Sequence, residues 1–443
     1  MIKRTKFAGE ILVVSLLVTA SILLIGSDDA QEDGRNTSSV VLGAASVLDG
    51  YRVTSLDDVT AAMREYAETG FNQAVIRMSG DQTRDSWILK ECEADSIKLV
   101  AWLPSGYYGG SDDSLAKPLE YLTRSTAFTG LIMKDEPSAA DFKELAGIKN
   151  ACETIMPAGK FAIANLFPNY ATTEQLGVSS YEQYVSEYVR IVRPKVLCYD
   201  HYPITRAVRN SRSSKDLFRF MSNLSVIRQA AYRAKIPFWN VIQSWGYLDK
   251  PAPNLFEYRW MMNMTFALGG RGVIAFPYRN TYDEGEGPEK WKDAPIASDG
   301  KRTFEYNVVK QCNFEMHAFD EAFSQFENVG VFLYHPPRYV LDALKGDYVR
   351  TDYSPLKNIS GNGSVVVGCM DSKDGKGLYV ANASFGKGAD VRIDIYGSRQ
   401  FEIWGKTGLE QRGLGNKVNV KLERGEAKFI RFNDQSRLKL EKF

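Results

Sequence analysis

The stretch GLIMKDEP, residues 130–137, runs from apolar residues directly into two adjacent carboxylates, Asp135 and Glu136, and ends at Pro137. The apolar residues predict a buried strand, and the proline predicts its end because it has no N–H to donate to a sheet. A buried strand that ends in two acids would place ionisable groups at the edge of a core, where carboxylates serve as acids and bases if the strand belongs to a barrel. Taken alone, the stretch also fits a solvated strand end followed by a helix cap at Ser138.

Apolar strand-like runs alternate with amphipathic helical stretches from residue 40 to residue 276. The starts of successive runs lie roughly 25 to 40 residues apart, which is the length of one strand–helix unit. Eight such units in succession predict an α/β fold of the (β/α)8 barrel type. A doubly wound open sheet would alternate in the same way, but no G-x-G-x-x-G follows a run. The runs are residues 40–44, 71–78, 97–103, 130–133, 160–166, 196–199, 237–242 and 272–276.

The pattern changes beyond about residue 326, where short strands alternate with turns rich in Gly, Asn and Lys. Clean alternation of apolar and polar residues, as in VRIDI at 391–395, predicts an antiparallel β-sandwich of roughly 90 residues. The expected strands are residues 364–369, 378–382, 391–396, 401–404, 418–422 and 427–432. We therefore expect a barrel region at 40–330 and a β-sandwich at 345–435.

The N-terminal segment carries a basic start and then an apolar run, so residues 1–26 are interpreted as a signal peptide, with an uncleaved anchor as the alternative. A polar linker follows at 27–39. This pattern predicts a secreted, periplasmic or cell-surface protein, with no membrane partner beyond the possible anchor.

The charge and cysteine content exclude several classes of protein. Lys and Arg total 55 against 54 Asp and Glu, which does not predict a nucleic-acid partner. The five cysteines show no C-x-x-C spacing, and only three histidines are present, so neither a zinc site nor a disulfide framework is expected. We expect no metal and no cofactor.

Acidic, amide and aromatic side chains follow most of the predicted strands. Because the functional face of such a barrel lies at the carboxyl ends of its strands, these side chains are expected to share one end of the barrel. Aromatic rings stack on sugar rings, while carboxylates and amides bond to hydroxyls, so the set predicts a carbohydrate substrate. The expected contacts are Arg77, Asn165, Tyr199, His201, Tyr202, Gln243 and Tyr278, with Trp102, Tyr107 and Trp245 as stacking platforms. Tyr202 could instead simply close the barrel.

A barrel followed by a small β-sandwich resembles secreted glycoside hydrolases. The Asp-Glu-Pro at 135–137 is similar to the Asn-Glu-Pro of the large barrel clan that includes many β-glycosidases. In that clan the Glu is the acid/base residue, so the resemblance implies that Glu136 is the general acid and Asp135 an electrostatic or orienting neighbour. Burial and Asp135 are both expected to raise the pKa of Glu136.

The sequence departs from that clan at the end of the seventh strand, where Gln243 stands in place of a nucleophilic Glu. Asp200, at the end of the sixth strand, is then the expected second carboxylate. Its distance from Glu136 would be roughly 5–5.5 Å for retention of configuration or 6.5–9.5 Å for inversion. The Asp135–Glu136 pair is also similar to that of β-hexosaminidases, and Tyr199–Asp200 to a pair in chitinases, where the acetamido group of the substrate is the nucleophile. A barrel that binds glycans without catalysis is the remaining alternative.

Overall fold

The computed structural model describes residues 40–49, 53–108, 112–280, 292–344, 349–373 and 375–433. The predicted signal peptide or anchor and the predicted linker lie outside these ranges. Within them, none of the helices combines the length and the apolar character needed to cross a bilayer.

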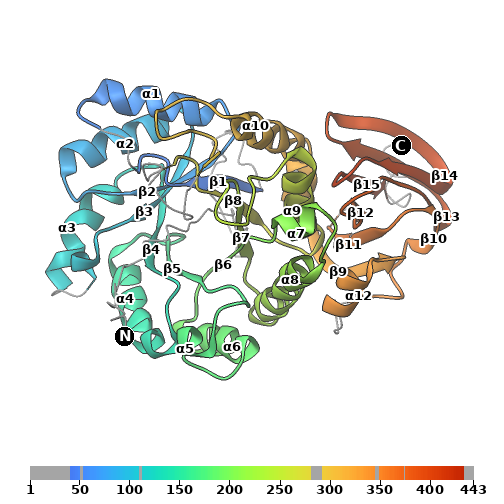
Figure 1. Cartoon of the computed structure of the whole chain (residues 1–443), viewed down its shortest axis with the longest axis horizontal. Helices are drawn as coiled ribbons and strands as arrows, with labels where there is room; N and C mark the ends of the chain where they lie inside the picture. The colour runs from blue at the N-terminus through green and yellow to red at the C-terminus, as the bar shows by residue number, and fades with distance from the viewer. Residues whose placement is uncertain are drawn as a thin grey trace, which may run out of the picture.

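Eight parallel strands pair in sequence order, and β8 pairs with β1 to close a barrel (Figure 1). This arrangement confirms the predicted (β/α)8 fold. The strands are β1 (Val41–Ala45), β2 (Gln73–Arg77), β3 (Lys98–Trp102), β4 (Phe128–Asp135), β5 (Phe161–Leu166), β6 (Leu197–His201), β7 (Phe238–Gln243) and β8 (Gly272–Phe276).

Helices surround the barrel, and several of them begin at a residue whose side chain caps the first turn. Ser55 and Asp58 form a capping box at the start of α1, and Asn254 and Glu257 form one at the start of α9. The helices of the barrel region are α1 (Leu56–Ala67), α2 (Gln82–Ala94), α3 (Asp112–Leu122), α4 (Phe142–Ile155), α5 (Thr173–Leu176), α6 (Tyr181–Val192), α7 (Arg206–Arg209), α8 (Lys215–Ala234), α9 (Leu255–Ala267), α10 (Phe304–His317) and α11 (Asp320–Gln325), with short 3-10 turns at Ser105–Tyr107 and Ala139–Asp141.

Successive side chains on the barrel strands point alternately inward and outward, with an interruption in β4 where the register shifts between Ile132 and Lys134. The inward set forms one apolar core, to which β2 contributes Val75 and β7 contributes Trp239 and Val241. The outward set, such as Ala74 and Ile76 of β2, packs against the helices in a second core. This alternation decides which residues at the strand ends can reach the mouth of the barrel.

The C-terminal region is an antiparallel sheet in the order β10-β13-β15-β12-β11-β9, with β14 also paired to β13. The long strand β13 pairs with β10 through its first half and with β15 through its second half, and its register shifts between Asp394 and Arg399. The sheet therefore folds over itself, and residues of both halves share one apolar core. This confirms the predicted β-sandwich. Its strands are β9 (Glu327–Tyr334), β10 (Leu356–Asn362), β11 (Val365–Asp371), β12 (Gly375–Asn382), β13 (Ala389–Gly405), β14 (Gly408–Leu422) and β15 (Ala427–Asn433), and a short helix, α12 (Arg338–Ala343), follows β9.

The sandwich packs directly on the barrel helices, and both faces of β11 are therefore buried. Val365 and Val367 point into the sandwich core, whereas Val366 and Met370 pack with the helices of the barrel. Helix α9 lies beneath β11 and β12, and 11 of its 13 residues are buried, so it has no solvent-exposed polar face of the kind that surface helices show.

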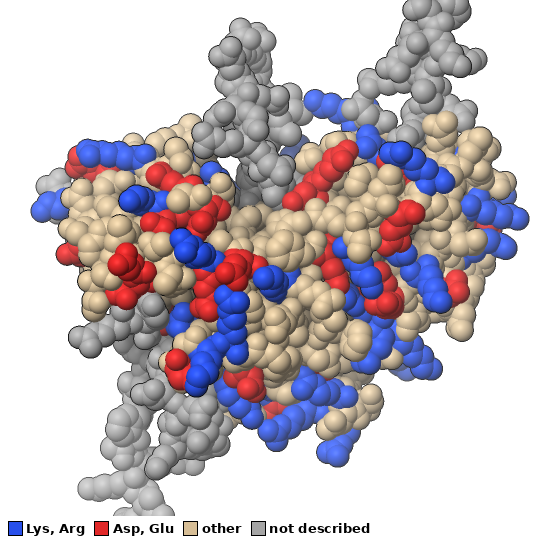
Figure 2. Space-filling view, turned by 90° about the horizontal axis from the view of Figure 1, so that it is seen from above, with Lys and Arg blue, Asp and Glu red and all other residues tan. Residues whose placement is uncertain are grey.

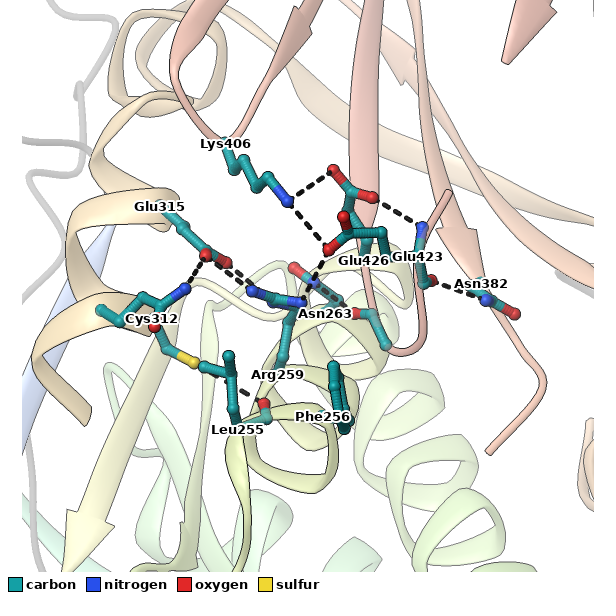
Figure 3. Close-up of polar contacts among 12 residues, drawn as sticks. Leu255, Phe256, Arg259, Asn263, Cys312, Glu315, Asn382, Lys406, Glu423 and Glu426 are labelled. Atoms are coloured by element: carbon teal, nitrogen blue, oxygen red, sulfur yellow. Dashed lines mark hydrogen bonds and ion pairs between the residues drawn. The ribbon is translucent and has the colours of Figure 1, made fainter. Parts of the chain in front are cut away.

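A cluster of charged side chains closes the edge of this junction (Figure 3). Arg259 of α9 is 3% exposed at its side chain and forms two hydrogen bonds, of 2.8 and 2.6 Å, to the carboxylate of Glu315 on α10. Its Nη1 lies 3.6 Å from Glu423 in the turn before β15, and Lys406 in the turn after β13 lies 2.8 Å from the same carboxylate. Arg259 thus ties the turn before β15 to α9, and Lys406 ties the turn after β13 to the same carboxylate.

Charged side chains of both signs are interspersed on the face seen in Figure 2, which agrees with the formal net charge of +1 for the whole chain.

Substitution of Gly425 is expected to loosen this junction. Gly425 has a φ of +69°, and its carbonyl accepts a 2.7 Å hydrogen bond from Asn263. A Cβ at this position would lie 2.5 Å from the carbonyl oxygen of Phe256 and 2.9 Å from the amide of Trp260. Gly397 has a similar φ of +72°, but a Cβ there would meet no atom within 4 Å, so it serves as the matched control. We expect Gly397→Ala to cost about 1 kcal/mol in urea unfolding and Gly425→Ala about 1–3 kcal/mol more. Equal costs would show that the contact with α9 is not constraining.

Candidate active site

The acidic stretch that follows β4 lies at the carboxyl end of the barrel strands. Asp135 is in register with Asn165 of β5, whose Nδ2 donates a 3.1 Å hydrogen bond to Asp135 Oδ1. The Glu136 amide donates a 2.8 Å hydrogen bond to the Asn165 carbonyl. Glu136 has a φ of +43°, which costs an L-residue of order 1 kcal/mol or more. Lys134, in contrast, is half-exposed and pairs with Asp141 at 2.9 Å, outside the barrel.

Asp200 of β6 belongs to the inward set of side chains. Its neighbours of the same parity, Cys198 and Tyr202, are both part of the inner core. Asp200 is 1% exposed, and the Cys198 thiol lies 3.5 Å from the Asn165 Oδ1. Asn165 therefore links the acidic end of β4 to the inward face of β6.

The carboxyl groups of Glu136 and Asp200 influence each other. Burial raises the pKa of Glu136 far above that of a carboxyl in water, and the negative charges of Asp200 and Asp135 raise it further. Burial also raises the pKa of Asp200, but polar groups of Tyr202 and Asn165 lower it. Glu136 is thus the group that more readily keeps a proton, and Asp200 the one that more readily ionises. This division follows the pattern of an acid and a base in one site.

Arg77 and Trp102 occupy the inward ends of β2 and β3. The Arg77 guanidinium lies over the Trp102 ring, with Cζ 4.3 Å from its centroid, so one face of Trp102 is covered. Arg77 Nε is 3.3 Å from Asp49 Oδ2, but among the described residues its Nε and Nη2 have no hydrogen-bond partner. The ring of Tyr107 is half-buried nearby over Gly80 (φ +79°), where a Cβ would collide with its hydroxyl.

Three aromatic rings close the barrel near Asp200. Tyr202 and Trp245 meet edge to face with their centroids 4.7 Å apart, and Phe276 lies 5.3 Å from Trp245. All three are at least nine-tenths buried. Tyr202 is thus placed both to close the barrel and to contact Asp200.

Three of the residues predicted to contact the sugar are turned toward the helices. Tyr199 is fully buried in the outer core with helix residues. The Nδ1 of His201 lies 2.9 Å from the Asn223 Oδ1 of α8, and burial lowers the pKa of His201 to about 3. Tyr278 packs edge to face on Tyr66 of α1 at 4.9 Å. Their side chains therefore support the wall of the site rather than line its mouth.

Gln243, at the end of β7, is fully buried, and its amide group forms hydrogen bonds with backbone groups. Its Oε1 accepts a 3.0 Å hydrogen bond from the Ile204 amide. Its Nε2 lies 3.2 Å from the Ile204 carbonyl, 3.3 Å from that of Trp245 and 2.9 Å from that of Pro251. Gln243 thus holds together the loops that follow β6 and β7.

Replacing Gln243 by Glu is expected to destabilise the fold rather than supply a nucleophile. A carboxylate would point an oxygen at three carbonyl oxygens that now accept from an N–H. We expect a loss of about 2–4 kcal/mol in the free energy of unfolding at neutral pH. Gln400→Glu, at an exposed position of β13, is the control, with a change within about 0.5 kcal/mol. Unchanged stability together with higher activity for Gln243→Glu would contradict this role.

Two residues near the site, Tyr170 and Lys250, are not among those that the sequence patterns indicate. Tyr170 is 38% exposed, its ring lies 5.0 Å from that of His201, and the charges of Asp200 and Glu136 add to burial in raising its pKa. The Lys250 Nζ lies 5.9 Å from the Tyr170 ring and lowers the pKa of Asp200. Tyr170 follows β5 by a few residues, so its position after a strand was a usable signal. Lys250 lies far along the loop after β7, and no sequence pattern indicated it.

Within the part of the chain that the structure describes, no group of three or more His, Cys, Asp or Glu side chains is arranged to hold a metal ion.

No protein-family model matches the chain, and no curated protein matches it in sequence. Among solved structures it is similar to a β-galactosidase of glycoside hydrolase family 42 from G. stearothermophilus, with 9% identity, a TM-score of 0.53, and coverage of 89% of this chain and 98% of that one. It is also similar to an Anoxybacillus α-amylase, with 10% identity, a TM-score of 0.50, and coverage of 91% and 99%. At these identities the likeness concerns the fold, a barrel followed by a β-domain.

Proposed function

We propose that the protein is a glycoside hydrolase that cleaves a glycosidic bond in an oligo- or polysaccharide. The observation that carries the proposal is the placement of two carboxyl groups at the same end of the barrel: partly buried Glu136 directly after β4, and buried Asp200 on the inward face of β6. Two acids with different proton affinities at this end of a barrel are what acid/base hydrolysis requires. The fold shared with glycoside hydrolases of known structure is in keeping with this chemistry.

Glu136 is the proton donor in this proposal. Its proton goes to the glycosidic oxygen as the bond from that oxygen to the anomeric carbon breaks, which releases the leaving sugar as an alcohol. Asp200, ionised, either attacks the anomeric carbon to form a glycosyl ester, which water then hydrolyses with Glu136 as the base, or takes a proton from the water that attacks this carbon directly. Arg77, whose side chain is partly exposed at the inward end of β2, binds hydroxyls of the sugar, and the partly exposed ring of Tyr170 contacts the sugar. Asp135 raises the proton affinity of Glu136 and is itself held by Asn165.

A substrate-assisted reaction is the second candidate. It is favoured by the adjacency of Asp135 and Glu136 and by the position of Tyr202 on the inward face two residues after Asp200, since in such enzymes an Asp and a Tyr orient the acetamido group of the substrate. Aryl glycosides of N-acetylhexosamine and of the corresponding hexose separate the two candidates. Turnover of the plain hexoside would exclude the substrate-assisted route.

Asp135→Asn is expected to move the alkaline limb of the pH profile of kcat/KM to lower pH. That limb reports loss of the Glu136 proton, and the negative charge of Asp135 now opposes this loss. Removing the charge makes ionisation easier, so the pKa of Glu136 falls and activity is lost at a lower pH. Asp141→Asn, at the pair with Lys134 outside the barrel, is the control and should leave the limb in place. An unmoved limb in Asp135→Asn would contradict the electrostatic role.

We further propose that the protein acts outside the cytoplasm. The basic and apolar N-terminal segment supports this proposal. Fractionation of cells that express the full chain tests it, and recovery of the protein in the cytoplasm would contradict it.

A further inference from the structure

A groove lies at the junction of the barrel and the sandwich, against the C-terminal end of α8. We call it the α8 groove. It has a volume of about 450 Å³, and it is bordered by α8, β9 and residues 349–352. Figure 1 shows α8 next to β9 and α12 at this junction. Because α8 ends where β7 begins, the groove lies toward the end of the barrel opposite Glu136 and Asp200.

Arginine residues make up most of the charged lining of the α8 groove. Arg228, Arg233 and Arg350 line it, and among the described residues Asp352 is the one acid beside them. Asp352 lies 3.8 Å from Arg350. The lining thus carries more positive than negative charge, and the groove favours an anionic group.

Hydrogen bonds hold the side chain of one of these arginines and the backbone of another. Arg228 is 4% exposed, and its Nη1 donates a 2.6 Å hydrogen bond to the Leu268 carbonyl at the end of α9. The Arg350 amide donates a 2.7 Å hydrogen bond to the Val331 carbonyl of β9, which anchors the segment that carries it. The floor of the groove is thus preorganised, which lowers the entropic cost of binding a ligand.

An aromatic side chain stands at the border of the same groove. Tyr232, in the last turn of α8, is 64% exposed, one turn from Gln229 and next to Arg233. An exposed tyrosine face beside guanidinium, amide and hydroxyl groups suits a sugar ring that carries a charged substituent. A purely electrostatic surface for a polyanion would not need the ring.

We propose that the α8 groove is a second saccharide site, which binds a sugar that carries a carboxylate or a sulfate group. Tyr232 stacks on the sugar ring, and Arg233 and Arg350 hold the anionic group. The site is non-catalytic and does not rest on the proposed hydrolysis, since it lies at the other end of the barrel.

Calorimetric titration of the full chain carrying Glu136→Gln tests this proposal without turnover. The probes are trigalacturonate for the carboxylate, a sulfated carrageenan oligosaccharide for the sulfate, and neutral galactotriose and polyglutamate as references. We expect binding of at least one anionic saccharide, weaker at higher salt, and no comparable binding of either reference. Arg233→Ala and Tyr232→Ala should each weaken it by about fivefold to tenfold.

Two control variants match these substitutions. Arg190 is an exposed arginine in the last turn of the neighbouring helix α6, and Tyr396 is 55% exposed on the sandwich. Arg190→Ala and Tyr396→Ala should leave the affinity unchanged. The proposal is overturned if neither anionic saccharide binds, if polyglutamate binds as well as they do, or if binding survives Tyr232→Ala and Arg233→Ala unchanged, which would place it elsewhere on the chain.

Discussion

Replacing Glu136 by Gln is expected to lower kcat on a natural oligosaccharide by about 10²- to 10⁴-fold. The amide keeps the shape of the side chain, but its N–H protons are not acidic enough to be transferred to the leaving oxygen. An aryl glycoside whose leaving group is already acidic needs little protonation, so its cleavage should fall much less. The ratio of the two losses is the measurement that assigns Glu136 as the acid.

The control for this substitution is Glu144→Gln. Glu144 lies exposed in the first turn of α4, the helix that follows the acidic stretch. The substitution therefore removes one carboxylate of the same region without touching the site. Its kinetic constants should match those of the unaltered protein. If Glu136→Gln cleaves both kinds of substrate as fast as the control does, the hydrolase proposal fails.

Asp200→Gly is expected to lower kcat by a similar factor, at least about 10²-fold. If Asp200 is the base or the nucleophile, azide can enter the space that the side chain leaves, and turnover should recover with a glycosyl azide as product. If Asp200 only orients the acetamido group of a substrate, azide should not restore turnover. Product analysis by NMR distinguishes the two outcomes.

The control here is Asp216→Asn on α8. The charge of Asp216, like that of Asp200, acts on Tyr170, but its carboxylate is bonded to Thr205 outside the inner core. It should not change kcat. Loss of stability is not expected for Asp200→Gly to an extent that explains inactivity, because the substitution removes a buried charge. Full activity of Asp200→Gly would contradict the assignment of Asp200 as the second carboxylate of the site.

The barrel could be predicted because its signal is long-range and repeated: eight apolar runs at the spacing of a strand–helix unit admit few other arrangements. The sandwich strands β9 and β10 have a weaker signal in the sequence. The sequence of β10, LKNISGN, contains only two large apolar residues, and β9 follows α11 almost without a turn. The two strands expected at 391–396 and 401–404 form the single strand β13, because a register shift lets one chain serve both halves of the fold.

The location of the candidate site could be predicted, because the ends of parallel strands converge at one end of a barrel. Which side chains face inward was harder to predict. The sequence places all four residues at 199–202 in the site, yet alternation along β6 sends Asp200 and Tyr202 inward and turns Tyr199 and His201 toward the helices. Gln243 has the inward parity, but backbone groups of two loops occupy its amide. The path of those loops depends on contacts distant in the chain, which no local pattern encodes.

The burial of β11 on both faces makes the barrel and the sandwich an indivisible folding unit. A chain truncated before β9 would leave Trp260 and its neighbours on α9 facing water, and it should precipitate rather than survive as a trimmed enzyme. The C-terminal region is therefore no detachable accessory module, and a deletion experiment that abolishes activity would report on solubility before it reported on sugar recognition.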